Sequence, residues 1–141
     1  MLYKKIMVPL DGSQASWKAL RKALELAQVS QAEMVALSVE EQLPHYAATI
    51  DEVQEAKSEL NGYFTKVQSD AIELAKQYGI ELRTRVVVGH AAQTIVRYAR
   101  DQGVELIVIG HIGHAGVWGV LLGSTTARVV DHAHCDVLVV R

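Results

Sequence analysis

Residues 106–125 read LIVIGHIGHAGVWGVLLGST, and this stretch indicates the architecture of the chain. Its first four residues are all apolar, which is typical of a parallel strand buried on both faces. Gly110 ends this strand, and Gly123-Ser124 opens a helical segment that continues to His132. A buried strand that leads through a loop into a helix is the repeating unit of parallel α/β sheets.

The rest of the chain alternates strands and helices in the same way. We predict strands over residues 6–10, 34–39, 80–88, 106–109 and 137–140, and helices after Ser13 and over 51–78, 91–102 and 124–132. This pattern predicts an α/β fold with one doubly wound, Rossmann-like domain over residues 1–141. We expect a five-stranded parallel sheet of order 3-2-1-4-5, with four helices on its two faces. Arg83 and Arg85 indicate that the third strand lies at an edge, because exposed charges deter edge pairing.

The composition excludes several classes of protein. The chain has 141 residues, of which 50% are hydrophobic and 21% charged, as in an ordinary globular domain. Its net charge of -2 argues against nucleic acid as a main partner, and no apolar run reaches the ~18 residues of a membrane span. The single cysteine, Cys135, excludes an internal disulfide. We find no signal peptide at the first residues, so we expect a cytoplasmic protein.

Two segments have the chemistry of a ligand site. Ligands of open parallel sheets bind outside the carboxyl ends of the strands, where the strand order reverses. Asp11-Gly12-Ser13 follows the first strand, and the glycine-rich stretch 110–124 follows the fourth, so both should face one crevice. The helix that begins at Ser124 presents free N–H groups and a positive dipole end to a phosphate. The hydroxyl groups of Ser124 and Thr125 can add donors or reach a phosphate-bound Mg²⁺.

These segments together resemble a known family. Gly110-x-x-Gly113, nine residues and then Gly123-Ser124 resembles the ATP-binding motif of the universal stress protein family. The opening stretch 8–13 (VPLDGS) and the closing stretch 135–140 (CDVLVV) resemble the first and last strands of that family. The resemblance covers essentially the whole chain. It implies a stress-response protein that binds ATP, or AMP or ADP, where the first and fourth strands end.

The resemblance also assigns roles to individual residues. The nucleotide-binding positions that it implies are Pro9, Asp11, Val39, Ile109, Gly110, Gly113, Gly123, Ser124 and Thr125. Pro9 and Val39 would border the adenine, and Asp11 would lie near the ribose or a phosphate-bound Mg²⁺ or Mn²⁺. Many members form homodimers through the last strand, here Val137–Val140, and a nucleotide-responsive regulatory role is implied.

Two histidines depart from the family pattern. His111 and His114 stand where a small polar residue and an Arg or Lys are common, and we consider both as phosphate contacts. A neutral imidazole neutralises a phosphate much less than a guanidinium does. We therefore predict a nucleotide affinity that rises as the pH falls toward ~6. Equal affinity at about pH 6 and pH 8 by calorimetry would contradict this prediction.

Other interpretations stay open beside this one. His111-Ile112-Gly113-His114 spells the HIGH signature of class I aminoacyl-tRNA synthetases, but that signature follows the first strand and here it follows the fourth. A P-loop is excluded, since no lysine precedes Ser124. No catalytic constellation emerges, so we expect binding with slow ATP hydrolysis at most. A slow ATPase or nucleotidyl-transfer enzyme and a nucleotide-free dimeric interaction module remain the alternatives.

The histidine content raises the question of a metal site. His111, His114, His132 and His134, with Cys135, contain ligand types that zinc prefers. The two histidine pairs flank a predicted helix, so the spacing favours histidines near solvent over a common tetrahedral site.

Overall fold

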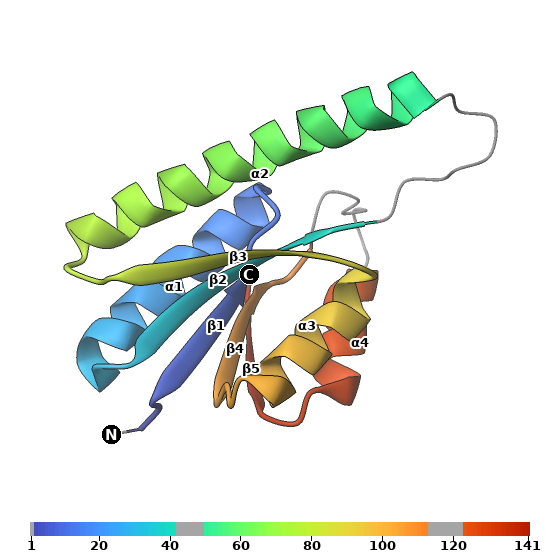
Figure 1. Cartoon of the computed structure of the whole chain (residues 1–141). Helices are drawn as coiled ribbons and strands as arrows, with labels where there is room; N and C mark the ends of the chain where they lie inside the picture. The colour runs from blue at the N-terminus through green and yellow to red at the C-terminus, as the bar shows by residue number, and fades with distance from the viewer. Residues whose placement is uncertain (1, 42–49, 113–122) are drawn as a thin grey trace.

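The computed structural model describes residues 2–41, 50–112 and 123–141 (Figure 1). Its strands are β1 (Lys5–Pro9), β2 (Glu33–Glu40), β3 (Leu82–Val88), β4 (Leu106–Gly110) and β5 (Asp136–Val140). Its helices are α1 (Gln14–Ser30), α2 (Ile50–Gln77), α3 (Ala91–Asp101) and α4 (Ser124–His132). Strands and helices therefore alternate as predicted.

The five strands form one parallel sheet of order β3-β2-β1-β4-β5, so the predicted fold class and strand order are confirmed. The central strand is β1, whose Met7 pairs with Val35 on one side and Ile107 on the other. Val35 and Ile107 are both apolar because both faces of this part of the sheet are covered. The chain reaches β2 and β4 on opposite sides of β1, which creates a switch point at the carboxyl end of the sheet.

Helices cover both faces of the sheet and divide the core in two (Figure 1). One cluster packs α1 and α2 against the even-numbered residues of β1, including Ile6 and Val8. The other packs α3 and α4 against Met7, Ile107 and Ile109. This division follows from the strand period, because successive side chains point to opposite faces.

Helix α1 begins and ends at residues that satisfy its free backbone groups. The Ser13 hydroxyl accepts a hydrogen bond from the Ser16 amide at 3.2 Å, so Ser13 caps the helix that the sequence predicts after it. The helix ends at Gln31, whose φ of 57° is left-handed. The Ala32 amide donates to the Ala27 carbonyl at 3.3 Å and closes the last turn.

The end of α2 shows one error in the sequence prediction. We expected a strand from Ile80, but β3 begins at Leu82. The amide of Gly79 donates to the Lys76 carbonyl and that of Ile80 to the Ala75 carbonyl, each at 3.0 Å. This is a Schellman motif, which a positive φ of 72° at Gly79 permits. Ile80 therefore completes the helix end and packs against the core.

Helix α2 is the longest helix, with 28 residues. Phe64, Val67, Ala71 and Ala75 form its buried side, and its first turns extend beyond the sheet (Figure 1). Among the described residues, no helix combines the length and the apolar character that a membrane crossing requires.

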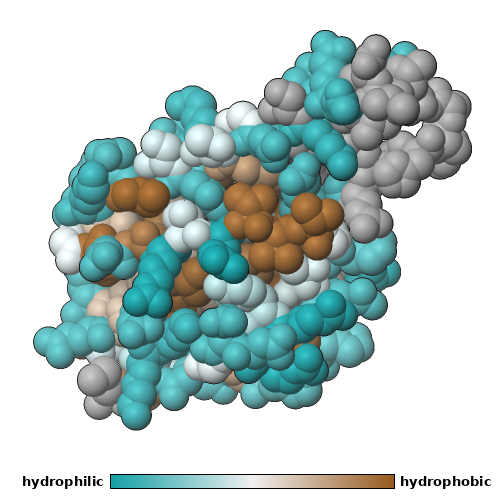
Figure 2. Space-filling view, viewed as in Figure 1, coloured by the Kyte–Doolittle hydropathy of each residue, from teal (hydrophilic) through white to brown (hydrophobic). Residues whose placement is uncertain are grey.

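Strands β3 and β5 form the two edges of the sheet. Arg83 and Arg85 are exposed on β3, as predicted for an edge strand. The second half of β3 also exposes apolar side chains, with Val86 at 42% and Val88 at 57% (Figure 2). Charge and apolar surface thus lie next to each other on this edge.

Candidate functional site

The candidate site lies where β2, β1 and β4 end side by side. Asp11 follows β1, Val39 lies one residue before the end of β2, and Gly110 is the last residue of β4. The sheet order places these three ends next to one another. The structure thus brings residues 11–13 together with residues 110–112 and 123–124, the described parts of the two segments that the sequence predicted to face one crevice.

Three of the predicted residues lie on the same face of the sheet. Val39 and Ile109 pack against the core cluster beneath α3 and α4. Pro9 lies two residues after Met7, a member of that cluster, so strand alternation places it on this face as well. Ile109 is only 5% exposed, so it offers an apolar edge to the crevice rather than a free side chain.

The turn after β1 is held in place from two directions. The Asp11 carboxylate accepts a hydrogen bond from the Ser13 amide at 2.9 Å, and the Asp11 carbonyl accepts one from the Tyr63 hydroxyl at 2.6 Å. Gly12 has a φ of 84°, which favours glycine. A Cβ at Gly12 would also collide with the Tyr63 hydroxyl. This turn therefore needs glycine both for its conformation and for its contact with α2.

Tyr63 is the residue of this site that sequence reasoning missed. It stands on α2, and its ring contacts that of Phe64 edge-on at a centroid distance of 5.3 Å. Partial burial, and then the nearby Asp11 carboxylate, raise the pKa of its phenol above 10.0. The available signal was an aromatic residue beside the apolar stripe of a long helix. That signal did not reveal a partner 52 positions earlier.

On the other side of the crevice, Gly110 allows α1 and β4 to approach closely. A Cβ at Gly110 would lie 2.8 Å from backbone atoms of Ala15 on α1. The buried Thr126 hydroxyl donates to the Gly110 carbonyl at 2.8 Å. The glycine therefore has a packing role, and its carbonyl fixes the first turn of α4 against the end of β4.

His111 connects three elements through its backbone. Its amide donates to the Val140 carbonyl of β5 at 2.8 Å, and its carbonyl accepts from the Gly123 amide at 3.0 Å. Its side-chain Nε2 is buried and has no hydrogen-bond partner among the described residues. Buried polar atoms nearly always have a partner, so this nitrogen needs one that the described residues do not supply.

The first turn of α4 lies next to His111. Gly123 is its N-cap residue and makes no side-chain cap hydrogen bond. Ser124 is exposed and Thr125 is half-buried, so the first amides and hydroxyls of the helix are available to an anion. The predicted residues Gly113 and His114 lie outside the described residues.

The histidines and Cys135 do not assemble a metal site in the described part of the chain. No group of three or more His, Cys, Asp or Glu side chains there has the geometry to hold a metal ion. His132 Nδ1 lies 2.9 Å from the Arg128 carbonyl oxygen of its own helix. Burial, and then the Asp136 carboxylate, raise the pKa of the Cys135 thiol. This environment disfavours the thiolate that binds metals.

These features define a doubly wound α/β protein whose candidate ligand crevice lies at the carboxyl ends of β1, β2 and β4. The model of the universal stress protein family matches residues 2–141. Universal stress protein MJ0531 of Methanocaldococcus jannaschii is 35% identical, over 99% of this chain and 83% of its own. The chain therefore belongs to the universal stress protein family.

Solved structures give the same result. The universal stress protein UspA from Lactobacillus plantarum is 32% identical, with a TM-score of 0.91 over 99% of this chain and 98% of its own. A universal stress protein crystallised in complex with cAMP is 26% identical. Its TM-score is 0.78 over 100% of this chain and 99% of its own. One relative with this fold therefore has an adenine nucleotide bound.

Proposed function

We propose that this chain binds an adenine nucleotide in the crevice at the ends of β1 and β4 and acts as a nucleotide-responsive stress protein. The observation that carries the proposal is the buried His111 Nε2, which lacks a partner among the described residues and lies beside the start of α4. The cAMP complex of a relative supports an adenine nucleotide as the ligand class. We further propose that residues 1–141 act as one domain in the cytoplasm.

The crevice offers a different surface to each part of a nucleotide. Pro9, Val39 and Ile109 share one face and would border the adenine. Asp11 would contact the ribose, because its turn is fixed by Ser13 and Tyr63. Gly110 and Gly113 would flank the ribose, and the first turn of α4, Gly123-Ser124-Thr125, would bind the phosphates. His111 and His114 complete the proposed phosphate contacts.

ATP with Mg²⁺ or Mn²⁺ is the specific ligand that we propose. Such a cation neutralises phosphate charge and uses oxygen ligands, mostly from phosphate and water. The carboxylate of Asp11 and the hydroxyls of Ser124 and Thr125 are oxygen groups of this site that fit it. Residues 111–114 carry no Arg or Lys, so charge neutralisation by the cation matters more here.

The test is a thermal shift and calorimetric titration with ATP·Mg²⁺, ADP, AMP and cAMP. A ligand at about 100 times its Kd should stabilise the fold by ~2.7 kcal/mol, or roughly 5–11 °C in Tm. Asp11→Ala and Gly123→Val should remove the shift, whereas Asp70→Ala, on the exposed side of α2, should keep it. No shift with any of the four nucleotides would overturn the proposal, and an unchanged shift in both site variants would place the site elsewhere.

A homodimer through Val137–Val140 is the assembly that we propose. Strand β5 is an edge of the sheet, so one row of its backbone donors and acceptors is free to pair with a second copy. Leu138 is 37% exposed on this strand and would be covered by the partner.

A further inference from the structure

A second groove runs between α3 and α4, on the same face of the sheet as Val39 and Ile109. The two helices lie side by side and point the same way (Figure 1). A cavity of about 600 Å³ lies along them, within the size range of small-ligand sites. Among the predicted nucleotide residues that the structure describes, only Thr125 lines this cavity.

The groove is strongly cationic although the protein as a whole has a net charge of -2. Arg97, Arg100 and Arg128 line it, which is three of the seven arginines of the chain, and its one acidic lining residue among those described is Glu41. Lysine is absent from the described lining. An arginine-only cluster is significant because the planar guanidinium binds phosphate oxygens in pairs, which an ammonium cannot do.

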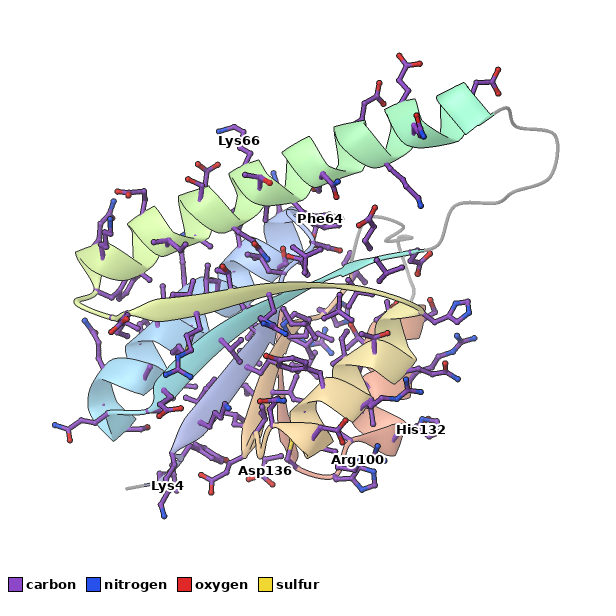
Figure 3. The ribbon with its side chains drawn as sticks, in the orientation of Figure 1. Lys4, Phe64, Lys66, Arg100, His132 and Asp136 are labelled. Atoms are coloured by element: carbon purple, nitrogen blue, oxygen red, sulfur yellow. The ribbon has the colours of Figure 1, made fainter. Side chains whose placement is uncertain are left out.

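The cationic side chains come from matching faces of the two helices. On α3, Gln93, Arg97 and Arg100 follow one another at helical spacing, and on α4 Arg128 has the same spacing from Thr125. Each set lines the groove, so Arg97 and Arg100 of α3 lie along one channel with Arg128 of α4. Arg100 and His132 mark the far end of the channel, where both helices finish (Figure 3).

The arginines differ in their ion pairs. Arg100 pairs with Asp101 at 3.3 Å, which offsets part of its charge. Arg97 and Arg128 have no ion pair with any described residue, and both are exposed. Both guanidinium groups are therefore available to an anion in the groove.

The N-terminal ends of α3 and α4 also lie along this groove. His90, the N-cap residue of α3, makes no side-chain cap hydrogen bond and lines the same groove. Helix α4 also lacks a side-chain cap at Gly123. The positive dipole ends of both helices therefore lie at the opposite end of the channel from Arg100 and His132.

We infer that the groove between α3 and α4 binds a phosphate-chain anion, held chiefly by Arg97 and Arg128. A chain of phosphoryl groups can contact the arginines of both helices at once. This phosphate chain can be a free polyphosphate. It can also be the extended phosphate tail of a nucleotide bound in the crevice, since the groove and the crevice share Thr125. The inference stands without the nucleotide proposal, because its residues, apart from Thr125, are different.

The probe is inorganic tripolyphosphate, titrated into the full chain by calorimetry at low salt. The double variant Arg97→Gln/Arg128→Gln should weaken its binding by at least about tenfold. The matched control, Arg83→Gln/Arg85→Gln, removes the same charge from exposed positions on β3 and should change it less than about twofold. The test variant should fold normally, as all of these arginines are exposed.

The outcomes separate this site from the crevice. Retained AMP binding in Arg97→Gln/Arg128→Gln, with lost tripolyphosphate binding, supports a groove site that is distinct from the crevice. Tripolyphosphate binding in the presence of saturating AMP identifies a free anion as the ligand. If AMP blocks the arginine-dependent binding of tripolyphosphate, the ligand of the groove is the phosphate tail of a nucleotide.

Three results would overturn the inference. The first is that tripolyphosphate does not bind to the unmodified protein. The second is that both double variants lose the same affinity for tripolyphosphate. The third is that a polyglutamate peptide binds and tripolyphosphate does not. The last result would indicate a carboxylate-rich protein partner.

Discussion

At the scale of single residues, Gly110 and Gly62 stand in opposite surroundings. Gly110 lies against Ala15, and a Cβ there would be 2.8 Å from backbone atoms that cannot move freely. Gly62 lies inside α2, where a Cβ would meet nothing within 4 Å. Gly110→Ala should therefore destabilise the fold by about 1–3 kcal/mol through overpacking. Gly62→Ala should stabilise it by ~0.5–1 kcal/mol, because alanine favours a helix.

Urea denaturation of the two variants measures both effects. Since the substitution is the same, the difference reports the surroundings of each glycine. A stability of Gly110→Ala equal to that of the unmodified chain would show that α1 can move away from β4 without cost.

The hydroxyl of Tyr63 should contribute to the stability of the fold. Tyr63→Phe removes the hydrogen bond to the Asp11 carbonyl and should cost about 0.5–1.5 kcal/mol of unfolding free energy. The control is Tyr78→Phe, whose hydroxyl has no hydrogen bond in the described part of the chain. It should change stability less. Weaker nucleotide binding in Tyr63→Phe alone, by calorimetry, would indicate that α2 fixes the Asp11 turn for the ligand.

The same tyrosine predicts a dependence on pH. The pKa of Tyr63 is raised in the folded protein above 10.0, so below that pH both states keep the phenol neutral. Above it the unfolded chain ionises first, and stability falls as the pH rises. The stability gap between the unmodified protein and Tyr63→Phe should therefore shrink from about pH 9 to about pH 11. A constant gap would contradict this.

The residues of the site differ in how well the sequence predicts them. Asp11, Gly110 and Gly123 stand next to apolar strands or a helix start, so local pattern locates them. The Tyr63 hydroxyl bond depends on how α2 crosses the sheet, which no local pattern specifies. Gly110 was assigned to ligand contact from its motif, and its packing against Ala15 appears only in three dimensions.

At the scale of elements, one hydroxyl fixes α4 to the sheet. Thr126→Val keeps the shape of the side chain but leaves the Gly110 carbonyl without its donor, in a buried position. The expected cost is about 1–3 kcal/mol. Thr65→Val is the control, because that hydroxyl bonds to the Asn61 carbonyl on the exposed side of α2. Similar unfolding midpoints in the two variants would show that α4 is held by other contacts.

The order and type of the elements are well predicted because the central strands are short apolar runs between polar or glycine breaks, and the edge strand β3 alternates apolar and charged residues before its valines. Helix boundaries are predicted where a cap is local, as at Ser13 and Gly79. The α3–α4 groove is different. Arg97 and Arg128 lie 31 positions apart, and only the packing of two helices on one face makes them line one channel.

At the scale of the whole molecule, the proposed dimer can be tested through its edge strand. Leu138→Asp places a charge on exposed β5 and should shift the protein from dimer to monomer in analytical ultracentrifugation. Val86→Asp, on the exposed opposite edge β3, is the matched control and should leave the dimer intact. Dimers that persist in Leu138→Asp and dissociate in Val86→Asp would place the interface at β3.

The strand order has a consequence for how the protein is made. Of the five strands of this sheet, β1 leaves the ribosome before the others, and it is the central strand that pairs with β2 and β4. Its partner β4 begins at Leu106, and at typical elongation rates this segment follows β1 by roughly 5–20 s. During that interval one apolar edge of the nascent sheet has no native partner. Once β4 has paired with β1, its own outer edge stays open until β5 emerges, so chaperone demand during synthesis should continue until Asp136–Val140 has left the ribosome.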